Sequence, residues 1–185
     1  MAIKRICVYC GSRAGKLQVY ADHATELGRK LAKNKIGLVF GGGSVGLMGI
    51  LADAVLDYGG EVHGVIPEHL MRKEVAHRDL TALHITKTMH ERKALMAELS
   101  DAFIALPGGF GTCEELFETI TWVQLKIHSK PIVILNVDGY YSPLAEFVDT
   151  AVDQQFIKAD NVDLFQAVET VDEALNLLGV THAEN

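Results

Sequence analysis

A glycine-rich turn joins a short apolar run to a helical pattern in the middle of the chain, and this junction constrains the fold most. The run over residues 102–106 (AFIAL) predicts a buried strand, and residues 107–112 (PGGFGT) follow it directly. Apolar residues then recur at roughly helical spacing from Leu116 to Leu125. Open α/β sheets bind ligands at such strand-to-helix turns, because the glycine main chain approaches a ligand closely.

The same junction predicts an anion site with a carboxylate beside it. The first N–H groups of a helix lack internal partners, and together with the positive end of the helix dipole they suit a phosphate. Thr112 is expected to cap a helix over residues 111–127, with Glu115 as its capping-box partner. Alternatively, Glu115 does acid–base work beside the ligand that the turn holds.

Strand and helix patterns alternate along the chain. We predict strands over residues 4–10, 37–40, 61–67, 80–86, 101–106, 131–137 and 164–168. We predict helices over residues 18–34, from 47 to a stop at Gly59, and over 88–99, 111–127, 143–155 and 171–178. This order predicts an α/β fold: a Rossmann-like doubly wound parallel sheet with helices on both faces, in a single domain over residues 1–185 whose tail frays from about residue 180.

Net charge and composition limit the kinds of molecule that the protein is expected to bind. The chain has 185 residues, is 49% hydrophobic and carries a net charge of −7. An acidic chain without a long basic run is not expected to bind a nucleic acid polymer or an anionic membrane. With no signal peptide and no apolar run long enough to span a bilayer, we expect a cytoplasmic protein.

The cysteine and histidine patterns do not predict a metal site. Cys7 and Cys10 match CxxC, but residues three apart on a strand point to opposite faces, so we expect two buried thiols. The eight histidines form no recognised ligand motif. We predict no metal.

Three glycine-bearing turns, over residues 11–15, 41–46 and 107–112, follow predicted strands. Neither of the first two matches GxGxxG, and no Walker A sequence is present, which argues against a dinucleotide site and a P-loop. A mononucleotide pocket at the carboxyl edge of the sheet fits these turns best.

The sequence PGGFGTCEE over residues 107–115 resembles the PGGxGTxxE signature of the Lonely Guy (LOG) family, the cytokinin riboside 5′-monophosphate phosphoribohydrolases. Members are often labelled "possible lysine decarboxylase". Residues 10–12, 41–49, 89–93, 100–106 and 136–141 also resemble the family in order and spacing, so the resemblance covers about residues 4–160. Phe110 stands where many members carry Tyr.

The resemblance implies hydrolysis of the N-glycosidic bond of N6-substituted AMP, and of AMP itself, without metal or organic cofactor. It implies a homodimer or a larger even-numbered assembly with the site at or near the subunit interface. It makes Arg92 and Glu115 the catalytic pair. The substrate-binding residues that it implies are Gly11, Ser12, Gly41, Gly42, Gly43, Glu74, Arg92, Lys93, Pro107, Gly108, Gly109, Phe110, Gly111, Thr112, Cys113 and Thr119.

The chemistry of the residue types agrees, with alternatives left open. A carboxylate such as Glu115 stabilises the positive charge that develops on a ribose ring, whereas an arginine positions groups and is not a base. A general AMP nucleosidase and a non-catalytic nucleotide-binding protein are alternatives, and a pyridoxal phosphate decarboxylase is disfavoured. Taken alone, Glu114 with Glu118 predicts an exposed like-charge pair, and Met89 with Met96 predicts packing.

Overall fold

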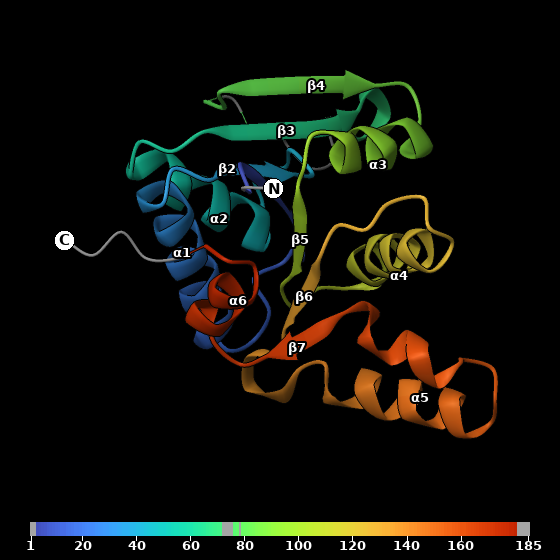
Figure 1. The fold of residues 1–185 in the computed structure, drawn as a ribbon. Helices are drawn as coiled ribbons and strands as arrows, with labels where there is room; N and C mark the ends of the chain where they lie inside the picture. The colour runs from blue at the N-terminus through green and yellow to red at the C-terminus, as the bar shows by residue number, and fades with distance from the viewer. Residues whose placement is uncertain (1–2, 72–75, 78, 181–185) are drawn as a thin grey trace.

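Seven parallel strands form one sheet, in the order β4-β3-β2-β1-β5-β6-β7. The computed structural model describes residues 3–71, 76–77 and 79–180. The strands are β1 (Arg5–Tyr9), β2 (Gly37–Phe40), β3 (Val62–Pro67), β4 (Ala82–Thr86), β5 (Ala102–Ala105), β6 (Ile132–Leu135) and β7 (Gln166–Val168). The predicted parallel α/β sheet is confirmed, and Figure 1 shows its strands from β4 at the top to β7 at the bottom.

Among the residues that the structure describes, six α-helices cover the two faces of this sheet. They are α1 (Gln18–Lys33), α2 (Gly46–Asp57), α3 (Met89–Glu98), α4 (Phe110–Gln124), α5 (Ser142–Asp153) and α6 (Val171–Leu177), with short 3₁₀ turns η1 (Glu68–Leu70), η2 (Val137–Gly139) and η3 (Ala159–Leu164). Helices α1, α2 and α6 lie on one face, and α3, α4 and α5 lie on the other (Figure 1). The predicted doubly wound arrangement is therefore confirmed. Within the described ranges, no helix is both long and apolar enough to cross a membrane.

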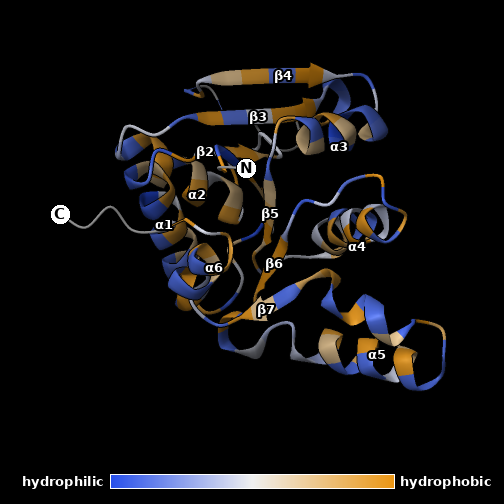
Figure 2. Ribbon diagram, viewed as in Figure 1, coloured by the Kyte–Doolittle hydropathy of each residue, from blue (hydrophilic) through white to orange (hydrophobic). Residues whose placement is uncertain are grey.

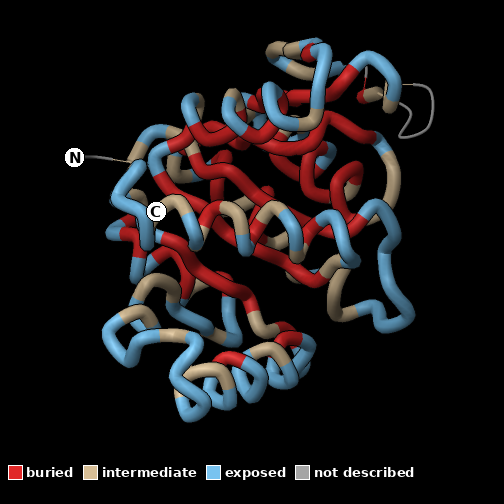
Figure 3. Tube along the Cα trace, turned by 90° about the vertical axis from the view of Figure 1, so that its right-hand side faces the viewer, coloured by how far each residue is buried: buried red, intermediate tan, exposed pale blue. Residues whose placement is uncertain are grey.

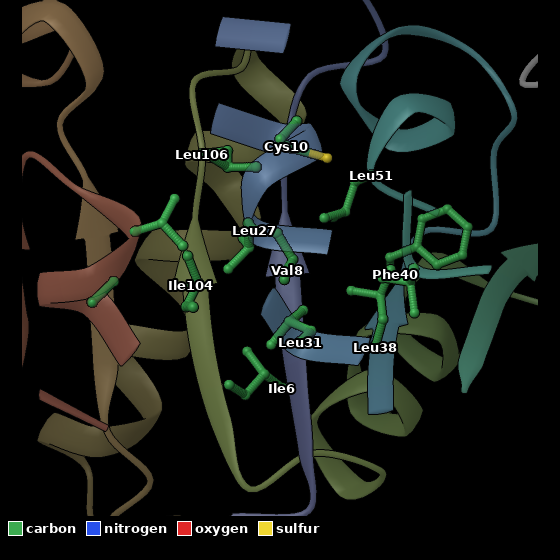
Figure 4. Packing of buried hydrophobic residues seen from close by; sticks show 14 of the residues in the cluster. Ile6, Val8, Cys10, Leu27, Leu31, Leu38, Phe40, Leu51, Ile104 and Leu106 are labelled. Atoms are coloured by element: carbon green, nitrogen blue, oxygen red, sulfur yellow. The ribbon is translucent and has the colours of Figure 1, made fainter. Parts of the chain in front are cut away.

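The larger apolar core lies between the sheet and α1, α2 and α6. Leu27 and Leu31, four residues apart on α1, are fully buried with Ile6 and Val8 of β1 in one cluster. Figure 4 shows these side chains converging above the strands. The 3.6-residue period of α1 thus places one apolar stripe on the sheet, and Figure 2 shows hydrophobic and hydrophilic residues recurring in turn along this helix.

The two faces separate the cysteines of the CxxC sequence. Cys7 is buried in the cluster under α3 and α4, and Cys10 is buried in the cluster under α1 and α2. Both are free thiols, as predicted, and burial raises the pKa of each well above its usual range. Neither therefore forms a thiolate near neutral pH.

The strand order reverses between β1 and β5, which are adjacent in space although far apart in sequence. The segments that follow them stay together, because the N–H of Gly11 donates to the carbonyl of Pro107 at 3.0 Å and the N–H of Leu106 donates to the carbonyl of Tyr9 at 2.9 Å. Such a switch point opens a crevice at the carboxyl ends of the strands. Figure 3 shows the central strands as buried, in contrast to the largely exposed α5.

Candidate active site

A cavity of about 250 Å³ lies at this switch point. Strand β1, the three glycine-bearing turns and helices α3 and α4 contribute to its wall. The described residues that line it are Val8, Tyr9, Cys10, Ser12, Gly41, Met48, Leu70, Met89, Arg92, Gly109, Phe110, Gly111, Thr112, Glu114 and Glu115. The structure therefore brings together both members of the predicted catalytic pair and the predicted glycine-rich turn.

Helix α4 begins earlier than the sequence predicts. Its first residue is Phe110 and its N-cap is Gly109, which has extended backbone and no side-chain cap. The predicted cap at Thr112 and its capping box with Glu115 are therefore wrong. Because the helix begins at Phe110, its first residues, from Phe110 to Thr112, border the cavity. Their N–H groups lack intrahelical acceptors and therefore suit an anion.

Close packing of the turn requires glycine at position 108. A Cβ atom there would lie 2.1 Å from Oγ1 of Thr112 and 2.9 Å from the main-chain nitrogen of Gly11. The absence of a side chain lets the turn after β5 rest against both the loop after β1 and the first turn of α4.

A main-chain carbonyl group of β3 and another of the turn after β2 hold the Arg92 side chain. Its Nε donates to the carbonyl of Val65 at 3.0 Å, and its Nη2 donates to the carbonyl of Gly41 at 3.1 Å. Only 5% of Arg92 is exposed, and its Nη1 lies 3.8 Å from Oε1 of Glu115. The guanidinium is thus fixed in one orientation, with its charge directed at that carboxylate.

Glu115 lies in the second turn of α4, and its side chain is 11% exposed. Behind it, the hydroxyl of Thr119 donates to the Glu115 carbonyl at 2.8 Å and lies 2.9 Å from the Tyr9 hydroxyl. Burial raises the pKa of Tyr9, so its phenol stays neutral. Thr119 therefore supports the residue pair from within the protein and is not among the described lining residues.

The Lys93 amine is directed at α4. Its Nζ donates to Glu118 Oε1 at 3.0 Å and also contacts Glu114 Oε1. Burial lowers the pKa of Lys93, but the hydrogen bonds to Glu114 and Glu118 outweigh this effect and raise it. The expectation of an exposed like-charge pair holds in part: the Glu114 side chain is 53% exposed and that of Glu118 is 26% exposed, but both carboxylates share the ammonium group of Lys93.

A second hollow, of about 430 Å³, lies on the other side of the glycine-rich turn. Six of the predicted substrate-binding residues line it, namely Gly11, Ser12, Pro107, Gly108, Gly109 and Phe110, and Ser12, Gly109 and Phe110 also line the first cavity. The hydroxyl of Tyr140, at its wall, donates to the carbonyl of Gly108 at 2.6 Å. This hydrogen bond stabilises the glycine-rich turn after β5 at the second hollow.

Gly42, Gly43 and Cys113 are not among the described residues that line the cavity. Gly42 has a φ of +76° that favours glycine, Gly43 pairs with Ala76 in an isolated bridge, and Cys113 is half-buried in α4. Glu74 lies outside the described residues.

Several of the lining residues were not predicted from the sequence. Tyr9 and Val8 precede the first glycine-bearing turn, and their position at the end of a predicted strand was a usable signal. Met89 was expected only to pack, but it lines the cavity, whereas Met96 packs in the core as predicted.

Together, the fold and the cavity define an α/β protein with a crevice suited to a small phosphorylated ligand and a buried arginine–carboxylate pair beside it. A family model described as "Possible lysine decarboxylase" matches residues 48–178. The chain is 50% identical over 175 residues to "Cytokinin riboside 5′-monophosphate phosphoribohydrolase LOG5" of Arabidopsis thaliana, covering 95% of this chain and 77% of the relative. It is 54% identical over 171 residues to "Probable cytokinin riboside 5′-monophosphate phosphoribohydrolase LOGL1" of Oryza sativa subsp. japonica, covering 92% and 77%. The chain belongs to this family, the LOG family, as the sequence resemblance predicted.

Solved structures share the fold at lower sequence identity. The Moco carrier protein of Chlamydomonas reinhardtii aligns with a TM-score of 0.71 at 24% identity, covering 96% of each chain. The molybdenum cofactor binding protein of Rippkaea orientalis aligns with a TM-score of 0.72 at 19% identity, covering 97% of each chain. These likenesses concern the fold alone.

Proposed function

We propose that this chain hydrolyses the N-glycosidic bond of N6-substituted adenosine 5′-monophosphates, and of AMP, to release the free base and ribose 5-phosphate. The observation that carries the proposal is the placement of Glu115 beside Arg92 in a cavity bordered by the first turn of α4. The relatives named as cytokinin riboside 5′-monophosphate phosphoribohydrolases, at 50% and 54% identity, support it.

In the proposed reaction, the oxygen of water bonds to C1′ of the ribose and the C1′–N bond breaks. The electron pair of that bond leaves with the base, which takes up a proton. Positive charge develops on the ribose ring, and the Glu115 carboxylate stabilises it and orients or deprotonates the water. Arg92 positions that carboxylate, because two carbonyl groups fix its guanidinium and its Nη1 lies 3.8 Å from Oε1 of Glu115.

The substrate phosphate is proposed to bind the first turn of α4. The N–H groups of residues 110–112 point toward the start of the helix, and Thr112 adds a hydroxyl at the cavity wall. Apolar side chains of Met48, Leu70 and Met89 line another part of the cavity and suit an adenine ring and its apolar substituent.

Pyridoxal phosphate chemistry, which the family description suggests, does not fit the residues present. A decarboxylase of that kind needs a lysine amine for a Schiff base. None of the described lining residues is a lysine, and the amine of Lys93 is bound by Glu114 and Glu118. No step of the proposed reaction uses such a cofactor.

We further propose a homodimer or a larger even-numbered assembly that acts in the cytoplasm. Phe110, which lines the cavity, is 96% exposed, and the apolar side chains of Phe117 on α4 and Phe147 on α5 are also exposed. Association would cover such residues. The free thiols Cys7, Cys10 and Cys113 fit a reducing compartment. Light scattering of the purified protein measures the assembly.

A panel of nucleotides tests the proposed activity. Isopentenyl-AMP, AMP and adenosine are incubated with the protein, and free base is measured by chromatography. We expect base from both monophosphates and little from adenosine, because the nucleoside offers no anion to the α4 turn. Binding of AMP without release of any base would instead support a non-catalytic nucleotide-binding protein.

A further inference from the structure

Two adjacent residues of α3 direct their charges to different places. Consecutive residues of a helix lie about 100° apart around its axis. Arg92 accordingly extends to the cavity, while Lys93 extends to the side of α4, and both are only 5% exposed. A buried ammonium group requires compensating partners, and Glu114 and Glu118 supply them.

The partners of Lys93 bracket Glu115 along α4. Glu114 precedes Glu115, and Glu118 lies one turn further along the helix. The three contacts of Lys93 and Arg92 with these carboxylates therefore all join the same two helices at the cavity. Arg92 itself is fixed to β3 and to the turn after β2, so α3 is a support from which α4 is held.

We propose that Lys93 is a positioning residue, which holds the start of α4 through Glu114 and Glu118 so that the Glu115 carboxylate stays at Arg92, and that it does not bind the substrate phosphate. This inference rests on the proposed function of Glu115. Without the Lys93 ammonium, Glu114 and Glu118 become an uncompensated like-charge pair on one face of α4, which destabilises the turn that carries Glu115.

The chain contains a matched control. Lys30 on α1 also contacts two carboxylates, those of Glu26 and Asp172, each at 2.6 Å, and its side chain is 12% exposed. It joins α1 to α6 on the opposite face of the sheet. Lys30→Met removes the same kind of contact without touching the cavity, so it separates loss of stability from loss of positioning.

Steady-state kinetics with AMP and adenosine test the proposal. For Lys93→Met we expect kcat for AMP to fall about tenfold or more, because small displacements of a reacting group are costly. We expect KM to change by no more than about twofold, and the preference for AMP over adenosine to persist, because no ground-state contact with phosphate is lost. Lys93→Arg should recover most of kcat, and Lys30→Met should retain wild-type kcat and KM.

Variants of the two carboxylates that contact Lys93 form the second part of the experiment. The double variant Glu114→Gln, Glu118→Gln should lower kcat as Lys93→Met does, and adding Lys93→Met to it should cause little further loss, because the three groups act as one unit. If Lys93→Met does not fold, Glu118→Gln alone should give a smaller kcat loss with unchanged KM, and wild-type kcat there would overturn the proposal.

The result that would overturn the positioning role of Lys93 differs from the result that would overturn the proposed function. A raised KM for AMP and a lost preference over adenosine in Lys93→Met, with normal kcat in the double variant, would show that Lys93 binds phosphate. That result would overturn the positioning role and leave the proposed function standing. Absence of base release by the wild-type protein would overturn the proposed function, and the role of Lys93 with it.

Discussion

The two faces of the sheet bury different kinds of side chain. Under α1, α2 and α6, the large cluster around Leu27, Leu31 and Phe40 is made of apolar side chains. Under α3 and α4 the cluster is smaller, and Arg92, Lys93 and Thr119 are buried beside it. The first face supplies hydrophobic stabilisation, whereas the second gives up some of that stabilisation to hold charged groups in fixed positions.

This difference explains where the cavity lies. Apolar packing is non-directional, so it sets the spacing of layers but not the orientation of a polar atom. Hydrogen bonds from Arg92 to Val65 and Gly41 are directional, and they fix the guanidinium next to Glu115. The comparison predicts that variants of one face lose stability, while variants of the other lose activity.

The largest effect is expected for Glu115→Gln. The amide keeps the size of the side chain but removes the negative charge, so base release from AMP should fall about 10²- to 10⁴-fold. AMP binding, measured by calorimetry, should persist, because the α4 turn is intact. A variant that releases base at the wild-type rate would remove Glu115 from the reaction.

Leu27→Ala and Leu116→Ala test the division between the faces directly. Both leucines are fully buried, so each truncation should lower the free energy of unfolding by about 2–5 kcal/mol. Leu116 follows Glu115 on α4, so only its truncation should also lower kcat of the folded protein. Denaturant unfolding and kinetics at low temperature measure the two effects; equal kcat losses would contradict the division.

Gly41→Ala is expected to reduce activity. A Cβ atom at this position would lie 2.1 Å from Nη2 of Arg92, so the guanidinium should leave its hydrogen bonds to the carbonyl groups and shift away from Glu115. We expect kcat to fall about tenfold. Gly37→Ala, at the other end of β2, crowds the stem of Arg5 at 3.0 Å and should leave kcat unchanged. Equal kinetics for both variants would refute the role given to Arg92.

The smallest effect is expected for Tyr9→Phe. Loss of the hydroxyl bonded to Thr119 should lower the free energy of unfolding by about 1 kcal/mol. It should lower kcat only a few-fold, because Thr119 retains its bond to the Glu115 carbonyl. Tyr141→Phe, which removes a buried hydroxyl bonded to the carbonyl of Leu106, serves as the comparison and should change stability alone.

The sequence predicts the fold well because its strands and helices alternate with clear periods. The start of α4 was predicted less accurately than the strands and the other helices. Thr112 and Glu115 match a capping box, but the helix begins at Phe110 and Gly108 packs closely against Thr112. The partners of Lys93 were equally inaccessible. Glu114 and Glu118 lie over twenty residues away, and only the folded sheet brings α3 beside α4.

A crystal structure of Glu115→Gln with AMP tests the central claim most directly. The account predicts the phosphate on the main-chain N–H groups at the start of α4, and ribose C1′ next to residue 115 and Arg92. Ordered AMP bound elsewhere, for example wholly within the second hollow beside Tyr20 and Tyr140, would contradict it.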